Sequence, residues 1–502
     1  MPSRLLLVLA GFGLAIGSFV VVAEDTSAIP EGPEYPSPEW LVRETTNYLR
    51  TRDEANRELT DVDFQVRLAE QSVANVADYA TFQLEHGFIN AANLCATWAE
   101  TCAGDPYRYP GTDPFYDTVG TVTETLFYDR DCARISGRVW APMGATAGDD
   151  LPGVVITNGS IQAPETLYWW FAQALVESGY VVMTWDPRGQ GRSDTLAPDG
   201  SAGSNVDPSV FWNGTVDAID FFHATPDQTY PHNQRCADTV SPLFALDAAA
   251  PFNPFHDIVD PDRLGLAGHS LGASAVTTVQ GYDPWPGEID DANPVDVIVA
   301  WDSLSDTAGD TDAPIVPRVP ALGQTSEYGI LGGPHTEPPD PMAHLDGLQA
   351  WTDADVPVVN QTILGSTHFE WSLIPTRPVV AFSATSWEDW GRPMAEHYSV
   401  AWMDRWLKQS DEPGFATADQ RLLDDATFCE RHSFYYRSAR DFPDRSGQRQ
   451  LCEDIRAGCA AQQQGRADGL AESRGGGLGG GLLLFLLVAA FRPGRCSRSV
   501  RS

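Results

Sequence analysis

The fold is decided by a five-residue stretch, Gly268-His269-Ser270-Leu271-Gly272, which places a serine between two glycines. An apolar segment, residues 263–267, comes directly before it, and small residues that suit a helix, residues 273–276, come directly after it. This order predicts a strand, a sharp turn with the serine at its tip, and a helix. Such a turn strains the serine backbone and exposes its hydroxyl. The flanking positions must be glycine, because a Cβ there would collide with the neighbouring strand and helix.

The pattern resembles the nucleophile elbow of α/β-hydrolases, in which that serine attacks the substrate. The resemblance implies an α/β protein of the α/β-hydrolase fold, with a mostly parallel central sheet flanked by helices. Ser270 would be the nucleophile. Residues 186–194, D-P-R-G-Q-G-R-S-D, also resemble the loop after the fourth strand of this family. We interpret these residues as shaping a turn and pairing charges rather than touching substrate.

A second segment supplies the backbone donors that acyl transfer needs. Residues 151–160 are typical of a buried apolar strand that ends in a tight glycine turn. The N–H of Ser160, together with the N–H of Leu271, would form a two-donor oxyanion hole, because fixed dipoles stabilise the developing alkoxide. Asn158 stands where esterases and lipases of this fold usually carry histidine. The donor on this loop is therefore Ser160 or the residue next to it.

The catalytic base can be chosen by elimination. The chain order serine, acid, histidine leaves five of the ten histidines, those after Ser270. Of these, only His368 directly follows an apolar strand, residues 356–364. In the family that this sequence resembles, the catalytic histidine lies in the loop after the last strand. His397 lies in an amphipathic terminal helix, residues 395–407, and we interpret it as a packing residue.

Two carboxylates end successive predicted strands, so the acid of the triad has two candidates. Asp302 follows residues 295–301, and Glu327 follows residues 319–326. The usual position after the penultimate strand favours Glu327, with Asp302 as the alternative used by some relatives. Either carboxylate would hold the imidazole of His368 in the correct tautomer and stabilise the imidazolium.

The composition excludes some partners without naming a substrate. The chain has 502 residues, with 32 basic and 69 acidic side chains and a net charge of −37. Such an acidic excess disfavours nucleic acid and anionic membrane surfaces as partners. We attribute it to codon bias or to a salty environment rather than to an acid-specific function. No metal or organic cofactor is expected.

Both ends of the chain resemble targeting signals. Arg4 precedes an apolar run, residues 5–22, and small residues up to Ala23 suit cleavage of a secretory signal peptide. At the other end, residues 475–481 are glycine-rich, residues 482–491 are apolar, and four arginines follow. This tail resembles the sorting tails processed by rhombosortase, which implies a sorting protease as partner. As a helix, residues 475–491 would span about 25 Å, which is short for a lasting membrane anchor. A single-span anchor is the alternative.

Cysteine usage agrees with export. Seven of the eight cysteines lie in the body of the chain, and Cys496 lies in the tail. Two pairs, Cys95 with Cys102 and Cys452 with Cys459, share a spacing of seven, but the spacing does not fix the connectivity. The Cys-x-x-Cys spacing of many zinc and redox sites does not occur.

These observations predict five segments. They are a signal peptide at 1–23, an N-terminal helical extension at 24–115, a catalytic domain at 116–410, a polar cysteine-bearing extension and linker at 411–474, and the glycine-rich sorting tail at 475–502. We expect an exported serine hydrolase that cleaves carboxylic esters, from small-molecule or lipid substrates, through an acyl-enzyme, with the membrane contacted at least transiently by the tail. A peptidase of the same fold and a catalytically silent surface binding module are the alternatives.

Overall fold

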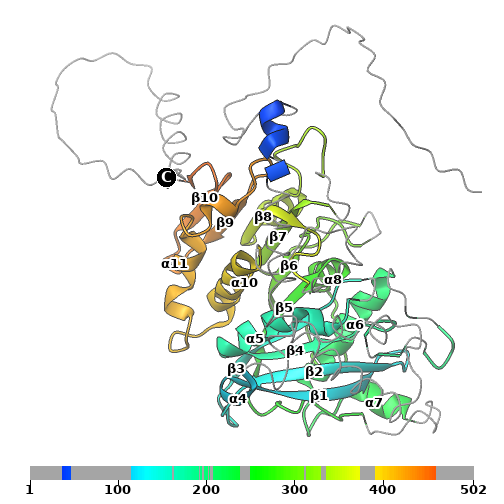
Figure 1. Ribbon diagram of the computed structural model, residues 1–502. Helices are drawn as coiled ribbons and strands as arrows, with labels where there is room; N and C mark the ends of the chain where they lie inside the picture. The colour runs from blue at the N-terminus through cyan, green and yellow to red at the C-terminus, as the bar shows by residue number, and fades with distance from the viewer. Residues whose placement is uncertain are drawn as a thin grey trace, which may run out of the picture.

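The structure is a computed structural model that describes residues 37–43, 45–46, 115–160, 163–191, 193–194, 197–201, 203, 207–237, 249–309, 313–329, 335–372 and 391–459. These residues form a ten-stranded sheet with helices on both faces (Figure 1). The strand order is β1-β2-β4-β3-β5-β6-β7-β8-β9-β10.

The strands are β1 (Gly120–Tyr128), β2 (Arg134–Pro142), β3 (Leu151–Thr157), β4 (Val181–Trp185), β5 (Val259–His269), β6 (Val295–Trp301), β7 (Ala321–Tyr328), β8 (Val358–Thr367), β9 (Ala439–Pro443) and β10 (Arg449–Cys452). The central strands from β4 to β8 all pair in parallel. The outer strands β1, β2, β9 and β10 pair antiparallel. The predicted parallel sheet is therefore the centre of a wider, mixed sheet.

The helices are α4 (Phe115–Thr118), α5 (Trp169–Glu177), α6 (Pro208–His223), α7 (Pro231–Cys236), α8 (Leu271–Val279), α9 (Asp346–Asp353), α10 (Arg392–Leu407) and α11 (Ala418–Leu423), with short 3-10 turns at Glu165–Tyr168, Phe415–Thr417 and Cys429–Arg431. Helices α5 and α10 pack on one face of the sheet, and α6 and α8 pack on the other.

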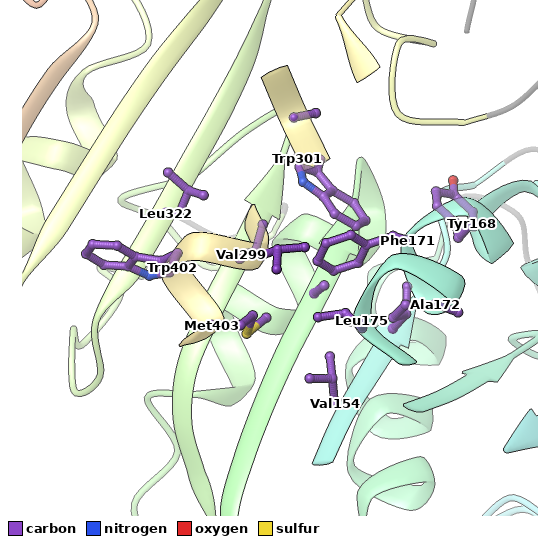
Figure 2. Close-up of a cluster of buried hydrophobic side chains, with 14 of the residues drawn as sticks. Val154, Tyr168, Phe171, Ala172, Leu175, Val299, Trp301, Leu322, Trp402 and Met403 are labelled. Carbon is purple, nitrogen blue, oxygen red and sulfur yellow. The ribbon is translucent and has the colours of Figure 1, made fainter. Parts of the chain in front are cut away.

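Two apolar clusters fill the space between the sheet and these helices. Successive side chains of a strand point to opposite faces, so Val154 lies in one cluster and Val155 in the other. Figure 2 shows the first cluster, in which Phe171 of α5 meets Trp301 edge to face, with ring centroids 4.8 Å apart. Trp301 is the last residue of β6, and this packing fixes the strand end that carries Asp302.

The C-terminal extension is part of the same sheet. Strand β9 pairs with β8, and β10 pairs with β9, so the described residues of the predicted 411–474 segment extend the sheet of the predicted 116–410 domain. Of the predicted N-terminal extension, residues 38–43 and 45–46 are helical, and Arg43 lies over the ring of Tyr435 at 3.7 Å. The signal peptide at 1–23 and the tail at 475–502 lie outside the described residues. Within the described ranges, no helix is long and apolar enough to cross a membrane.

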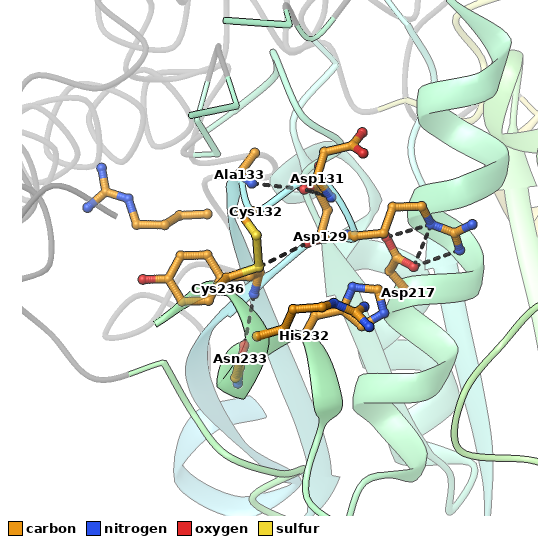
Figure 3. The surroundings of a disulfide bond; sticks show 12 residues. Asp129, Asp131, Cys132, Ala133, Asp217, His232, Asn233 and Cys236 are labelled. Atoms are coloured by element: carbon orange, nitrogen blue, oxygen red, sulfur yellow. Dashed lines mark hydrogen bonds and ion pairs between the residues drawn. A yellow bond between two sulfur atoms is a disulfide. The ribbon is translucent and has the colours of Figure 1, made fainter. Parts of the chain in front are cut away.

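Disulfides crosslink the outer parts of the fold. Cys132, in the turn after β1, is bonded to Cys236 at the end of α7, 104 residues away (Figure 3). Cys452 is bonded to Cys459, one of the two pairs that share a spacing of seven. Every cysteine in the described ranges is in a disulfide. Bonds of this kind persist in oxidising compartments, which supports an extracellular or periplasmic protein.

Candidate active site

Three side chains meet where parallel strands end. Ser270 follows β5 and begins the turn into α8, His368 follows β8, and Asp302 follows β6. The Oγ of Ser270 lies 3.0 Å from Nε2 of His368, and Nδ1 of His368 lies 2.6 Å from Oδ2 of Asp302. The carboxyl ends of parallel strands share one edge of a sheet, which is why residues so far apart in the chain come together. This is the geometry of a nucleophile, a general base and an orienting acid.

The turn around Ser270 is strained in the way that the sequence predicts. Ser270 has a φ of 56° and a ψ of −118°, which a residue with a side chain rarely adopts. A Cβ on Gly268 would lie 2.2 Å from the carbonyl oxygen of Gly272, and a Cβ on Gly272 would lie 2.2 Å from that of Thr157. Both glycines are therefore required by close backbone approach.

Asp302 is held as a carboxylate by its partners. It lies in the left-handed region, with a φ of 50°, and its Oδ1 accepts hydrogen bonds from the N–H of Ser326 at 2.9 Å and from the hydroxyl of Ser326 at 3.0 Å. Burial by itself would raise the pKa of Asp302. The hydrogen bond and charge of His368, with the Ser326 N–H, outweigh burial and hold this pKa below its ordinary value.

Glu327, which the sequence favoured as the acid, does not contact His368, so this prediction is wrong. Its Oε2 accepts from the N–H of Gly365 at 2.8 Å, and its Oε1 accepts from the hydroxyl of Ser433 at 2.7 Å. The carboxylate is fully buried in these contacts. Glu327 therefore joins β7 to β8 and to the C-terminal extension.

Strand alternation explains the error. Strand β7 continues to Tyr328, so Glu327 lies within the strand and not after it. Ser326 points its hydroxyl at Asp302, and the next side chain along a strand must point to the opposite face. The sequence had placed the strand end at Ser326, which would have freed Glu327 to turn towards the histidine.

One predicted oxyanion donor directly follows Ser270, and the other lies in the loop after β3. Leu271 is the first residue of α8, so its N–H has no acceptor within the helix. Ser160 lies in the loop after β3. In this loop the N–H of Gly159 donates to the phenol oxygen of Tyr168 at 2.9 Å and is engaged. Because the N–H of Gly159 is already used, the N–H of the next residue, Ser160, remains the predicted oxyanion donor on this loop.

Two residues that the sequence analysis did not assign to the site lie directly behind it. Nε2 of His269 lies 2.7 Å from the carbonyl oxygen of His368, and Nδ1 of His269 lies 2.8 Å from the hydroxyl of Tyr168. Burial, followed by the nearby His368, lowers the pKa of His269 to about 3, so its ring is neutral. His269 could have been assigned to the site from the sequence, because it lies inside the serine motif next to Ser270. Tyr168 lies about a hundred residues upstream, in an apolar segment, and gave no such signal.

The loop at 186–194 pairs charges, as interpreted from the sequence. Asp194 forms an ion pair with Arg134 at 3.0 Å, and Arg188 forms one with Asp131 at 3.0 Å. Asn158 donates from Nδ2 to Oδ1 of Asp186 at 3.2 Å. This last contact ties the loop after β4 to the loop that carries the predicted oxyanion donor.

Three other histidines after Ser270 contact residues outside the site or behind it. His397 of α10 packs its ring against Phe428, with centroids 5.2 Å apart, in agreement with a packing role. His432 is fully buried and lies 2.9 Å from the hydroxyl of Ser438. His335 reaches the carbonyl oxygen of Ser326 at 3.1 Å, behind Asp302. Among the described residues, no group of three or more His, Cys, Asp or Glu has the arrangement of a metal site.

Comparisons with known proteins do not assign a function to this chain. No protein-family profile and no curated protein matches the chain. Among solved structures, the chain is similar to a ferulic acid esterase from Streptomyces cinnamoneus, with 14% sequence identity and a TM-score of 0.35 over 60% of this chain and 94% of that one. A likeness at this level carries no argument about activity. The site itself is the basis for a function.

Proposed function

We propose that this protein is an exported serine hydrolase of the α/β-hydrolase fold that cleaves carboxylic esters. One observation carries the proposal: the hydroxyl of Ser270, at the tip of a strained turn, lies 3.0 Å from Nε2 of His368, whose Nδ1 lies 2.6 Å from Asp302. A serine hydroxyl is a weak nucleophile until an adjacent base removes its proton, and this arrangement provides that base.

The proposed reaction has two halves. His368 takes the Ser270 proton while Oγ attacks the ester carbonyl, and the amides of Ser160 and Leu271 hold the resulting oxyanion. The tetrahedral intermediate collapses as the carbon–oxygen bond to the alcohol breaks, and the imidazolium of His368 protonates that alcohol. Water, deprotonated by His368, then attacks the acyl-enzyme and releases the acid and free Ser270. The carboxylate of Asp302 stabilises the imidazolium in both halves.

A small-molecule or lipid ester is the proposed substrate. Export rests on the disulfides together with the apolar segment that follows Arg4. The glycine-rich tail at 475–502 is proposed to be a sorting signal read by a membrane protease, on its resemblance to rhombosortase-processed tails.

The experiment is a panel of p-nitrophenyl esters of increasing acyl length, run beside p-nitroanilides of the same acids. The wild type should hydrolyse the esters, and Ser270→Ala should lower turnover by roughly 10⁴-fold while the protein stays folded. Ser274→Ala, one turn along α8, is the matched control and should retain activity. Cleavage of anilides in preference to esters would point to a peptidase. A folded wild type that cleaves neither class would favour a silent binding module.

A further inference from the structure

A continuous chain of buried hydrogen bonds runs behind the proposed nucleophile. It begins at the N–H of Gly159, which donates to Tyr168 Oη at 2.9 Å, and continues from Tyr168 Oη to Nδ1 of His269 at 2.8 Å. It ends where Nε2 of His269 lies 2.7 Å from the carbonyl oxygen of His368. The chain thus connects the loop of the predicted oxyanion donor, the turn of Ser270 and the loop of the proposed base.

The direction of each hydrogen bond follows from the chemistry of its ends. A carbonyl oxygen only accepts, so Nε2 of His269 must carry the proton and donate to His368. The neutral ring then offers Nδ1 as an acceptor, and the hydroxyl of Tyr168 donates to it. The phenol oxygen is left to accept from Gly159. Every polar atom in the chain is satisfied in one arrangement only, which fixes the tautomer of His269.

The surroundings of His269 favour a neutral ring and enclose it. Its ring lies between those of Tyr168, His368 and Trp371, with centroid distances of 5.8, 4.8 and 6.0 Å. Both Tyr168 and His269 are buried. A positive charge on His269 would repel the imidazolium that His368 forms during the reaction, and it would give Nδ1 a proton that Tyr168 already supplies. A neutral His269 ring therefore allows His368 to become an imidazolium without charge repulsion.

We propose that Tyr168 and His269 are positioning residues, which hold the predicted oxyanion loop and the loop of His368 in register with Ser270. This inference rests on the proposed function. Neither side chain needs to touch substrate. The Tyr168 hydroxyl fixes Gly159, the residue before the predicted donor Ser160, and His269 fixes the backbone of His368. Donors and base must be placed within a fraction of an ångström to serve the transition state.

The test is Tyr168→Phe, which removes one oxygen from the chain. The matched control is Tyr230→Phe, because Tyr230 is equally buried and its hydroxyl donates a single hydrogen bond away from the site, to the carbonyl oxygen of Tyr128 in β1 at 2.8 Å. We expect Tyr168→Phe to lower kcat, and the rate of fluorophosphonate labelling, by about 10- to 100-fold with KM changed less than about threefold. Tyr230→Phe should lower the melting temperature similarly and leave kcat within about twofold of the wild type.

Variants of His269 test the same chain if Tyr168→Phe does not fold. His269→Gln keeps a donor and an acceptor, so it should retain more kcat than His269→Leu, which keeps neither. The double variant with Tyr168→Phe and His269→Leu should lose no more activity than the worse single variant, because one chain is broken twice. Wild-type kcat in Tyr168→Phe, or equal losses in Tyr168→Phe and Tyr230→Phe, would overturn the inference. A wild type that fluorophosphonate does not label would instead overturn the proposed function, and this inference would fall with it.

Discussion

At the scale of single residues, the site depends on which carboxylate reaches His368. Asp302 and Glu327 both lie near the ends of adjacent strands; Glu327 is buried, and Asp302 is largely buried, with its side chain 7% exposed. Asp302 meets the imidazole at 2.6 Å, whereas Glu327 is engaged by Gly365 and Ser433. The two carboxylates therefore differ in what they stabilise, the first an imidazolium and the second a joint between strands.

Isosteric substitutions separate these roles. Asp302→Asn should lower kcat by about 10²- to 10⁴-fold, because the amide cannot stabilise the imidazolium and favours the wrong tautomer of His368. Glu327→Gln should keep kcat within about threefold but lower the free energy of unfolding by about 1–3 kcal/mol, because its NH2 group would face a donor. Steady-state kinetics and urea unfolding of both variants measure the difference. A greater loss of kcat in Glu327→Gln would contradict the assignment of Asp302.

The sequence located the site well where the signal is local. Ser270 stands in a motif whose spacing is set by backbone contacts, and His368 directly follows an apolar strand. The choice between the acids depended on where β7 ends, and strand ends are the least accurate part of a sequence-based prediction. A residue inside the strand has its face set by the alternation of side chains, whereas a residue after the strand can turn towards either face. The contact of Tyr168 with His269 is long-range and follows only from the packing of α5 on the sheet.

At the scale of elements, the strand–turn–helix unit of β5 and α8 is built around close backbone contacts. Gly268 and Gly272 lie where the turn, the helix and the end of β3 meet. Each admits only a hydrogen in place of a side chain. The unit carries Ser270 and Leu271 together, so its geometry fixes the nucleophile and one predicted oxyanion donor at once.

Gly272→Ala should therefore destabilise the protein strongly. The new Cβ would lie 2.2 Å from the backbone oxygen of Thr157, and we expect a loss of at least about 3 kcal/mol, with failure to accumulate soluble protein as the extreme. Gly200→Ala is the control, because Gly200 has a φ of +88° with open space around it and should cost only about 1–2 kcal/mol. Denaturant unfolding compares the two. Equal losses would show that the close approach at Gly272 is not rigid.

The elements were predicted most accurately where their signals are short-range. The apolar strands β3 and β6 lie within the segments predicted at 151–160 and 295–301, because both stand out by composition. The strands β9 and β10 do not stand out in this way, because residues 439–452 are rich in charged side chains. Their charges are paired at the sheet edge, as Arg449 is with Asp441. The pairing of β9 with β8, and of β10 with β9, identifies them as strands.

At the scale of the whole molecule, two disulfides close loops of very different length. Cys132 and Cys236 are separated by 104 positions, whereas Cys452 and Cys459 are separated by seven. The entropy that a crosslink removes from the unfolded chain grows with the logarithm of the loop length. Replacing both cysteines of the first pair with alanine should lower the free energy of unfolding by about 5 kcal/mol, and replacing those of the second by about 2 kcal/mol. Denaturant unfolding checks the order, and a larger loss from the second pair would contradict it.

The proposed sorting tail makes a prediction about the mature chain. If a membrane protease cuts at the glycine run, residues 475–481, mass spectrometry of the protein from its native host should find a C-terminus within or near that run. Peptides that contain Cys496 should then be absent. An intact C-terminus at Ser502 on active, membrane-bound protein would instead establish a permanent anchor.

Every step of the proposed reaction requires Ser270 to be an activated nucleophile. The most direct measurement is fluorophosphonate labelling of the purified protein, followed by mass spectrometry of the labelled peptide. We predict one adduct, on the peptide that contains Ser270, with labelling abolished in folded Ser270→Ala and strongly slowed in Asp302→Asn. An adduct on a different residue, or undiminished labelling of Ser270→Ala, would contradict it.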